Sequence, residues 1–138
     1  MKVAVVYYSG TGNTLEMANE VVSKVNESGN EAVLLTASEF TSVDGYDAFA
    51  FGCPAMGAEV LEESEFQPMW DSVKGSLSSK KVGLFGSYGW GDGEWMRNWV
   101  ADAKDNGAIV INDGVICLQA MDEDTKNNLD ELALELVK

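Results

Sequence analysis

Glycines alternate with short polar residues near the start of the chain, directly after an apolar run. Glycine lets the backbone turn sharply and approach a ligand, and a following helix offers free N–H groups, so the stretch is typical of a phosphate-binding loop. It lacks the Lys of a Walker A loop and the third Gly of a dinucleotide fingerprint, which favours a monophosphate ester over a triphosphate. The alternative is a Gly-rich turn that only caps the helix. The residues of this predicted phosphate loop are Ser9, Gly10, Thr11, Gly12, Asn13 and Thr14.

Two more loops combine glycines with side chains that could lie against a flat ring. Residues 53–59 contain Met56, whose sulfur is polarisable, beside the conformationally free Gly57. Taken alone, this stretch and the glutamates after it are better explained as an exposed acidic loop that caps the next helix. Residues 86–93 place four glycines around Trp90, which leaves the indole few local neighbours, so we expect it to cover something else. Three other tryptophans are predicted to pack in the core: Trp70, Trp95 and Trp99.

Composition excludes several kinds of chemistry. The 138 residues include no His, so the chain has no Ser-His-Asp or Cys-His pair and no His-ligated zinc. Nine Lys and Arg against 23 Asp and Glu give a net charge of −14, which argues against nucleic acids and anionic membranes and favours partners with a positive patch. Two cysteines cannot form a zinc site alone, and no run approaches a signal peptide's apolar region or a membrane span. We therefore expect one cytoplasmic, reduced and soluble domain of monomer size over residues 1–138, without a metal site.

Apolar runs that alternate with helix-period segments must position these loops. Continuous β-branched and aromatic runs predict strands that are covered on both faces. Apolar residues about 3.6 positions apart predict helices, and Asp122 or Asp124 is a candidate N-cap for the last one. The predicted strands are residues 3–8, 32–36, 46–52, 81–86, and a fifth made of 108–111 and 114–118 with a bend between them. The predicted helices are one that buries Leu15, Ala18, Val22 and Val25 and ends at 28–30, then 66–73, 94–104, and one that carries residues 129–137.

This alternation predicts an α/β fold, a doubly wound five-stranded parallel sheet in the order 2-1-3-4-5 with helices on both faces. Ligands bind such sheets beyond the carboxyl ends of the strands, so the loops after strands 1, 3, 4 and 5 form the expected site. Strand 4 would separate Cys53 from Cys117 by about 9–10 Å, too far for a disulfide. A response-regulator receiver domain shares this sheet, but it needs acidic residues after strand 1 and an Asp after strand 3. This chain has Tyr7-Tyr8-Ser9 and Gly52-Cys53 there.

Taken together, the three loops resemble those of a known family. Residues 9–14, 52–57 with Glu59, and 86–93 closely resemble a short-chain bacterial flavodoxin of the type found in anaerobes, and the resemblance covers essentially the whole chain. It implies non-covalently bound FMN and low-potential, one-electron transfer between redox proteins rather than enzymatic catalysis. It also implies partners with a positively charged docking face, such as reductases and oxidoreductases that also use ferredoxin. The alternative is an FMN-dependent quinone or NAD(P)H reductase on the same fold, although the chain has little length to spare for a substrate pocket.

The resemblance further implies roles for individual residues. The phosphate loop would hold the FMN phosphate, Met56 would cover the inner face of the isoalloxazine ring, and Trp90 would cover the outer face. Glu59 would hydrogen-bond the pyrimidine end of the flavin. The polar edge of the ring would be approached through the backbone of Gly89, Gly91 and Asp92. The remaining implied contacts are Pro54, Ala55, Gly57, Ala58, Ser87, Tyr88 and Gln119.

Two features of the sequence would bias the redox states of a bound flavin. The Gly57–Ala58 peptide could rotate so that its carbonyl accepts a hydrogen bond from N5–H of the reduced ring, which would stabilise the one-electron-reduced form by ~1–2 kcal/mol. Between Lys24 and Lys74 the chain has ten acidic residues and no Lys or Arg, which disfavours the anionic, fully reduced flavin. We expect an acidic rim to steer a positively charged partner towards the flavin edge. The glutamates of this predicted rim are Glu59, Glu62, Glu63 and Glu65.

Overall fold

The computed structural model describes residues 1–10 and 12–138, so the predicted role of Thr11 lies outside the described residues. Five parallel strands form one sheet in the order β2-β1-β3-β4-β5, as the sequence predicts. The strands are β1 (Lys2–Tyr7), β2 (Glu31–Thr36), β3 (Ala48–Gly52), β4 (Lys81–Tyr88) and β5 (Ile109–Leu118). The helices are α1 (Asn13–Glu27), α2 (Phe66–Val73), α3 (Glu94–Asp105) and α4 (Glu123–Leu136), with short 3₁₀ turns at Ala37–Glu39 and Lys74–Ser76.

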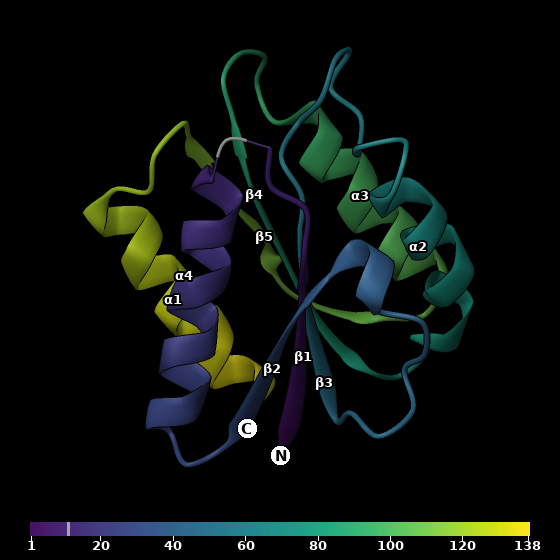
Figure 1. Ribbon diagram of the computed structural model, residues 1–138, viewed down its shortest axis with the longest axis vertical. Coiled ribbons are helices and arrows are strands. Elements are labelled where there is room, and N and C mark those ends of the chain that lie inside the picture. Colours follow the sequence, from purple (N-terminus) through teal and green to yellow (C-terminus); the bar gives the residue numbers. More distant parts are fainter. Residues whose placement is uncertain (11) are drawn as a thin grey trace.

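Helices cover both faces of the sheet. Figure 1 shows α1 and α4 together on one face and α2 and α3 on the other. The central strands β1 and β3 are therefore buried on both sides, and residues Val3 to Val6 are completely inaccessible to solvent. That double burial explains why these strands are continuous apolar runs instead of alternating ones.

The core on the α2–α3 face is aromatic. The predicted core positions of Trp70, Trp95 and Trp99 are confirmed, since each is at most 2% exposed. The ring of Trp99 meets the rings of Phe66 and Trp70 edge to face, with centroids 5.4 and 5.7 Å apart. This geometry is favourable for aromatic pairs and fixes the spacing between the two helices.

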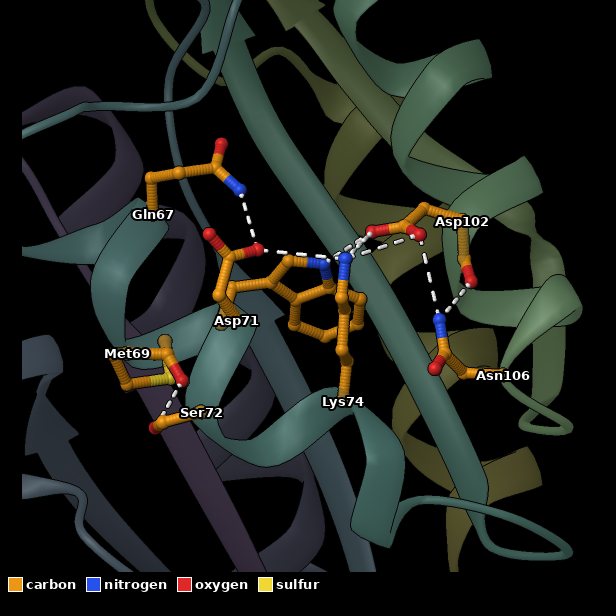
Figure 2. A network of polar contacts seen from close by, with 8 residues as sticks. Gln67, Met69, Asp71, Ser72, Lys74, Asp102 and Asn106 are labelled. Carbon is orange, nitrogen blue, oxygen red and sulfur yellow. Dashed lines mark hydrogen bonds and ion pairs between the residues drawn. The ribbon is translucent and has the colours of Figure 1, made fainter.

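A polar network ties α2 to α3 at the edge of this core (Figure 2). Asp102 on α3 accepts a hydrogen bond from the indole nitrogen of Trp70 at 2.8 Å. It also forms an ion pair with Lys74 at 3.1 Å. Lys74 also pairs with Asp71 at 3.4 Å, and Gln67 donates to the same carboxylate at 3.0 Å. The network therefore joins the two helices that follow the predicted ligand loops, near their C-terminal ends.

The structure corrects or refines the sequence-based predictions in three places. Strand β4 continues to Tyr88 and pairs with β5 as far as Leu118, which carries the start of the third loop into the sheet. Strand β5 is continuous through the predicted bend, which is a bulge whose residues all have positive φ: Asn112, Asp113 and Gly114. Across it β5 advances four residues while β4 advances two, so the bulge adds two residues without ending the strand.

The third correction concerns the buried face of α1. Met17, Ala18, Val21 and Val25 form this face, whereas Leu15 and Val22 are only partly buried. Val21 and Val22 are adjacent and equally apolar, so the sequence alone allowed either to face the sheet. At the last helix, Asp122 is the N-cap, because its side chain accepts from the backbone N–H of Thr125 at 2.8 Å.

The two cysteines are buried and free, as the strand order predicts. Burial raises the pKa of the Cys53 thiol to about 12 and that of the Cys117 thiol to about 11. Among the described residues, no helix has the length and apolar character that a membrane crossing requires.

Candidate functional site

A cavity of about 570 Å³ opens at the carboxyl ends of β1, β3, β4 and β5, where the strand order reverses. It is bordered by the loops after these four strands, which are the loops where the sequence predicts the ligand site. Its lining is mostly apolar with a few convergent polar groups, the usual character of a small-molecule site. The lining residues are Gly10, Asn13, Pro54, Ala55, Met56, Ser87, Tyr88, Gly89, Gln119 and Ala120. All of these except Ala120 are predicted FMN contacts, and Ala120 directly follows one of them.

The phosphate loop leaves its backbone open towards this cavity. A Cβ added at Gly10 or Gly12 would meet no atom within 4 Å. The backbone N–H of Gly12 donates to the Ser9 hydroxyl at 2.9 Å, which closes the loop on itself before α1 starts at Asn13. No described side chain caps the N-terminus of α1, so its first N–H groups remain available to an anion. These donors fit a phosphate ester.

Thr14 does not face the open side of the loop. Its side chain is 1% exposed, and its hydroxyl lies 3.1 Å from the hydroxyl of Ser87 on β4. The pair links the start of α1 to the strand that enters the third loop. The structure therefore places Thr14 as an internal tie next to the phosphate loop, a role that its sequence position alone could not reveal.

The β3–α2 loop (residues 53–65) starts as an extension of the sheet. The backbone N–H of Ala55 donates to the carbonyl of Ser87 at 3.0 Å. Met56 and Val60 then pair in both directions, with N···O distances of 2.9 and 3.0 Å, which makes a tight hairpin. Gly57 at its tip has a φ of 47°, and a Cβ there would meet no atom within 4 Å. The tip is thus exposed, and the space around it is free for the peptide rotation that the sequence predicts.

Glu59 joins this hairpin to the third loop. One oxygen of its carboxylate accepts a hydrogen bond from the backbone N–H of Gly93, at the N-terminus of α3, at 3.1 Å. A Cβ added at Gly91 would come within 2.4 Å of the same oxygen. Glu59 lines a second, smaller cavity of about 180 Å³ beside α2 and α3, not the 570 Å³ cavity.

Trp90 stands at the outer side of the site. It is 59% exposed, the side-chain environment expected if the indole packs on a ligand and not on the protein. Asp92 next to it is tied down by an ion pair with Arg97 at 3.0 Å. In the cavity wall, the backbone N–H of Gln119 donates to the carbonyl of Tyr88 at 2.7 Å, which fixes the turn after β5.

The predicted acidic rim is wrong in one member. Glu62 is 6% exposed and points inward, whereas Glu63 and Glu65 are exposed. Burial alone would raise the pKa of Glu62, but hydrogen bonds from the Ser64 side chain and from three backbone N–H groups outweigh it and lower the pKa. Its carboxylate caps α2, as the acidic-loop interpretation of this stretch expected, while its neighbours face solvent.

Known proteins with similar sequences and structures identify the family. Residues 5–135 match the family model described as Flavodoxin. The flavodoxin of Megasphaera elsdenii is 46% identical over an alignment of 116 residues that covers 83% of this chain and 85% of that protein. The flavodoxin of Clostridium beijerinckii is 43% identical over an alignment of 122 residues that covers 86% of this chain and 88% of that protein. The solution structure of two-electron reduced Megasphaera elsdenii flavodoxin has a TM-score of 0.84 at 43% identity and covers 96% of this chain and 98% of its own. The chain belongs to the flavodoxin family.

Proposed function

We propose that residues 1–138 form one FMN-binding domain that passes single electrons at low potential between redox proteins. Members of the flavodoxin family bind FMN and transfer electrons, and this chain matches the family along most of its length. The observation that carries the proposal is the 570 Å³ cavity, which the phosphate loop, the β3–α2 loop and the loop after β4 border together. When bound, FMN supplies the ring that accepts and donates the electrons.

The proposed contacts follow from what each loop offers. The phosphate loop would hold the phosphate through backbone N–H groups and the N-terminus of α1, with no basic side chain required. Met56 and Trp90 would cover the two faces of the ring, since the first lines the cavity and the second is exposed beside it. Glu59, whose carboxylate accepts from Gly93 beside the cavity, would bind the pyrimidine end of the flavin by turning towards it. The other members of the proposed contact set are Pro54, Ala55, Gly57, Ala58, Ser87, Tyr88, Gly89, Gly91, Asp92 and Gln119.

A partner with a positively charged docking face is the proposed source and destination of the electrons. The net charge of −14 and the exposed Glu63 and Glu65 beside the site support this choice. A quinone or NAD(P)H reductase on the same fold is not favoured, because the flavodoxins of Megasphaera elsdenii and Clostridium beijerinckii match this chain over most of its length and most of theirs.

Stepwise anaerobic reduction of the FMN-loaded protein, followed by visible absorption, tests this function. We expect a one-electron-reduced form to accumulate before the colour bleaches. Direct bleaching without that form would mean two-electron chemistry and would move the assignment to the reductase class. Failure of the protein to take up FMN would contradict both functions.

A further inference from the structure

Glu62 differs from the other glutamates of the β3–α2 loop because both oxygens of its carboxylate accept hydrogen bonds from within the protein. One oxygen accepts from the backbone N–H groups of Glu65 and Phe66 at 2.8 and 2.9 Å. The other accepts from the backbone N–H of Ser64 at 2.8 Å and from the Ser64 hydroxyl. These donors are N–H groups at the start of α2, which no preceding carbonyl can satisfy. A single side chain therefore caps the helix where the loop ends.

The backbone of Glu62 also returns to the beginning of the loop. Its N–H donates to the sulfur of Cys53, at an N···S distance of 3.4 Å. Cys53 is itself fixed in the sheet, since its N–H donates to the carbonyl of Phe85 at 3.1 Å and its carbonyl accepts from the indole of Trp95 at 3.2 Å. The two ends of the loop are thereby held together on a rigid base.

The residues of this loop that are proposed to contact FMN lie between these two anchors, Cys53 and Glu62. On the first arm, Ala55 is held to β4 by one backbone hydrogen bond, and the hairpin at Met56 and Val60 follows. On the second arm, Leu61 leads directly into Glu62. The position of the hairpin over the cavity thus depends on where Glu62 fixes the returning chain.

We propose that Glu62 is a positioning residue: through its cap on α2 and its contact with Cys53, it holds residues 56–59 in the conformation that contacts FMN. This inference rests on the proposed function. Releasing the anchor would let the hairpin adopt more conformations, so that FMN binding would have to order it again. The proposed effect comes from hydrogen bonds, not from the charge of Glu62.

Matched variants separate these two effects. Glu62→Gln, Glu63→Gln and Glu65→Gln each remove one negative charge within four residues, but only the first loses cap contacts. FMN affinity and both one-electron potentials would be measured for each, after the wild-type protein has been shown to bind FMN. If the wild-type protein does not bind, the proposed function fails, whereas a failure of this inference appears only in the comparison between variants.

We expect Glu62→Gln to weaken FMN binding about fivefold, the factor that corresponds to the loss of a typical helix cap. The two control variants should change it by less than about twofold, because exposed charges act weakly through water. The control variants should raise only the potential of the second electron, which forms the fully reduced flavin. Glu62→Gln should also shift the potential of the first electron. Equal affinities and equal potential shifts in all three variants would overturn the proposal.

Ser64→Ala provides a gentler second variant. It removes only the hydroxyl contact to Glu62 and leaves every charge in place, so it tests the anchor even if Glu62→Gln does not fold. We expect FMN binding about twofold weaker than in the wild type, in the same direction as Glu62→Gln. An unchanged affinity together with unchanged potentials would contradict a positioning role.

Discussion

Glu59 shows how one side chain serves two loops. Its backbone has a φ of 55°, a left-handed conformation that is costly for any residue other than glycine. The conformation points the carboxylate at the N-terminus of α3, where it accepts from Gly93. Because the N-cap position of α3 is a glycine without a side chain, Glu59 provides the cap from a distant part of the chain.

Replacing Glu59 with Ala should therefore destabilise the FMN-free protein by about 0.5–1 kcal/mol, the effect of losing a cap acceptor. Urea unfolding followed by far-UV circular dichroism measures the change in the free energy of unfolding. Glu63→Ala is the control, since this neighbour is exposed and should stay within about 0.5 kcal/mol of the wild type. Equal stabilities of the two variants would rule out the capping role.

Gly57 lies at the tip of the hairpin, where its backbone conformation can be tested by substitution. Its φ of 47° and the open space around it permit a rotating peptide, whereas a β-branched residue there costs about 1–2 kcal/mol. We expect Gly57→Thr to lower the maximum fraction of one-electron-reduced flavin during anaerobic reduction. Gly45→Thr is the matched control, because Gly45 also has a positive φ but lies in the turn before β3, at the far end of the sheet. A similar loss in both variants would show that general strain, not the peptide at Gly57, is responsible.

At the level of elements, α1 and α4 are joined by a cluster of charges around Lys126. Lys126 lies 3.5 Å from Glu20 on α1 and 3.6 Å from Asp130 on its own helix, and Glu123 also acts on it electrostatically. A hydrogen bond with Asp130, burial, and repulsion by Asp130 raise the pKa of Glu20, against the opposing effect of Lys126. The two carboxyl groups thus sit close enough to compete for one proton.

A pH-dependent stability follows from this cluster. The pKa of Glu20 is higher in the folded than in the unfolded chain, so the folded state binds the proton first and is favoured as the pH falls through that raised pKa. We expect Glu20→Gln to be more stable than the wild type at neutral pH, with a Tm about 2 °C higher, and this advantage to shrink in acid. Melting curves from about pH 7 to pH 4 would measure it. Glu27→Gln, exposed at the end of the same helix, should show no such convergence.

The elements were also the part that the sequence could predict best. Strands β1 and β3 are buried on both faces, so their apolar runs are unambiguous, and the strand order follows from the alternation with helices. Residues that act through distant partners could not be found in this way. The cap that Glu62 forms and the tie between Thr14 and Ser87 depend on side-chain directions, which polar residues in loops do not reveal by spacing. The site loops were predictable for a different reason. Clustered glycines and an isolated Trp90 are unusual in loops that serve only to connect packed elements.

Over the whole molecule, charge is distributed unevenly between the two ends of the sheet. Seven of the nine basic residues lie where strands begin or helices end, opposite the cavity. The other two, Arg97 and Lys126, are paired with carboxylates. The cavity end combines the exposed acidic loop with the acidic first turns of the helices. Its acidic residues include Glu16, Glu59, Glu63, Glu65, Asp92, Glu94, Asp122, Glu123 and Asp124.

This arrangement predicts that electron transfer to a positively charged partner slows as ionic strength rises, because salt screens the attraction. Stopped-flow measurement of the second-order rate over a salt series tests it. At low salt, Glu63→Lys at the cavity end should slow the reaction about threefold or more, while Glu27→Lys at the opposite end should leave it within about twofold. Equal effects of the two variants would show that net charge, not its placement, controls the encounter.

The two buried thiols have a consequence for the durability of such a protein. Sulfur is oxidised through its thiolate, and thiol pKa values of about 12 and about 11 leave almost none at neutral pH. Cys53 lies next to the loop that faces the cavity, but its sulfur is shielded from solvent. Turnover at a bound flavin is therefore expected to leave these two cysteine sulfur atoms unoxidised.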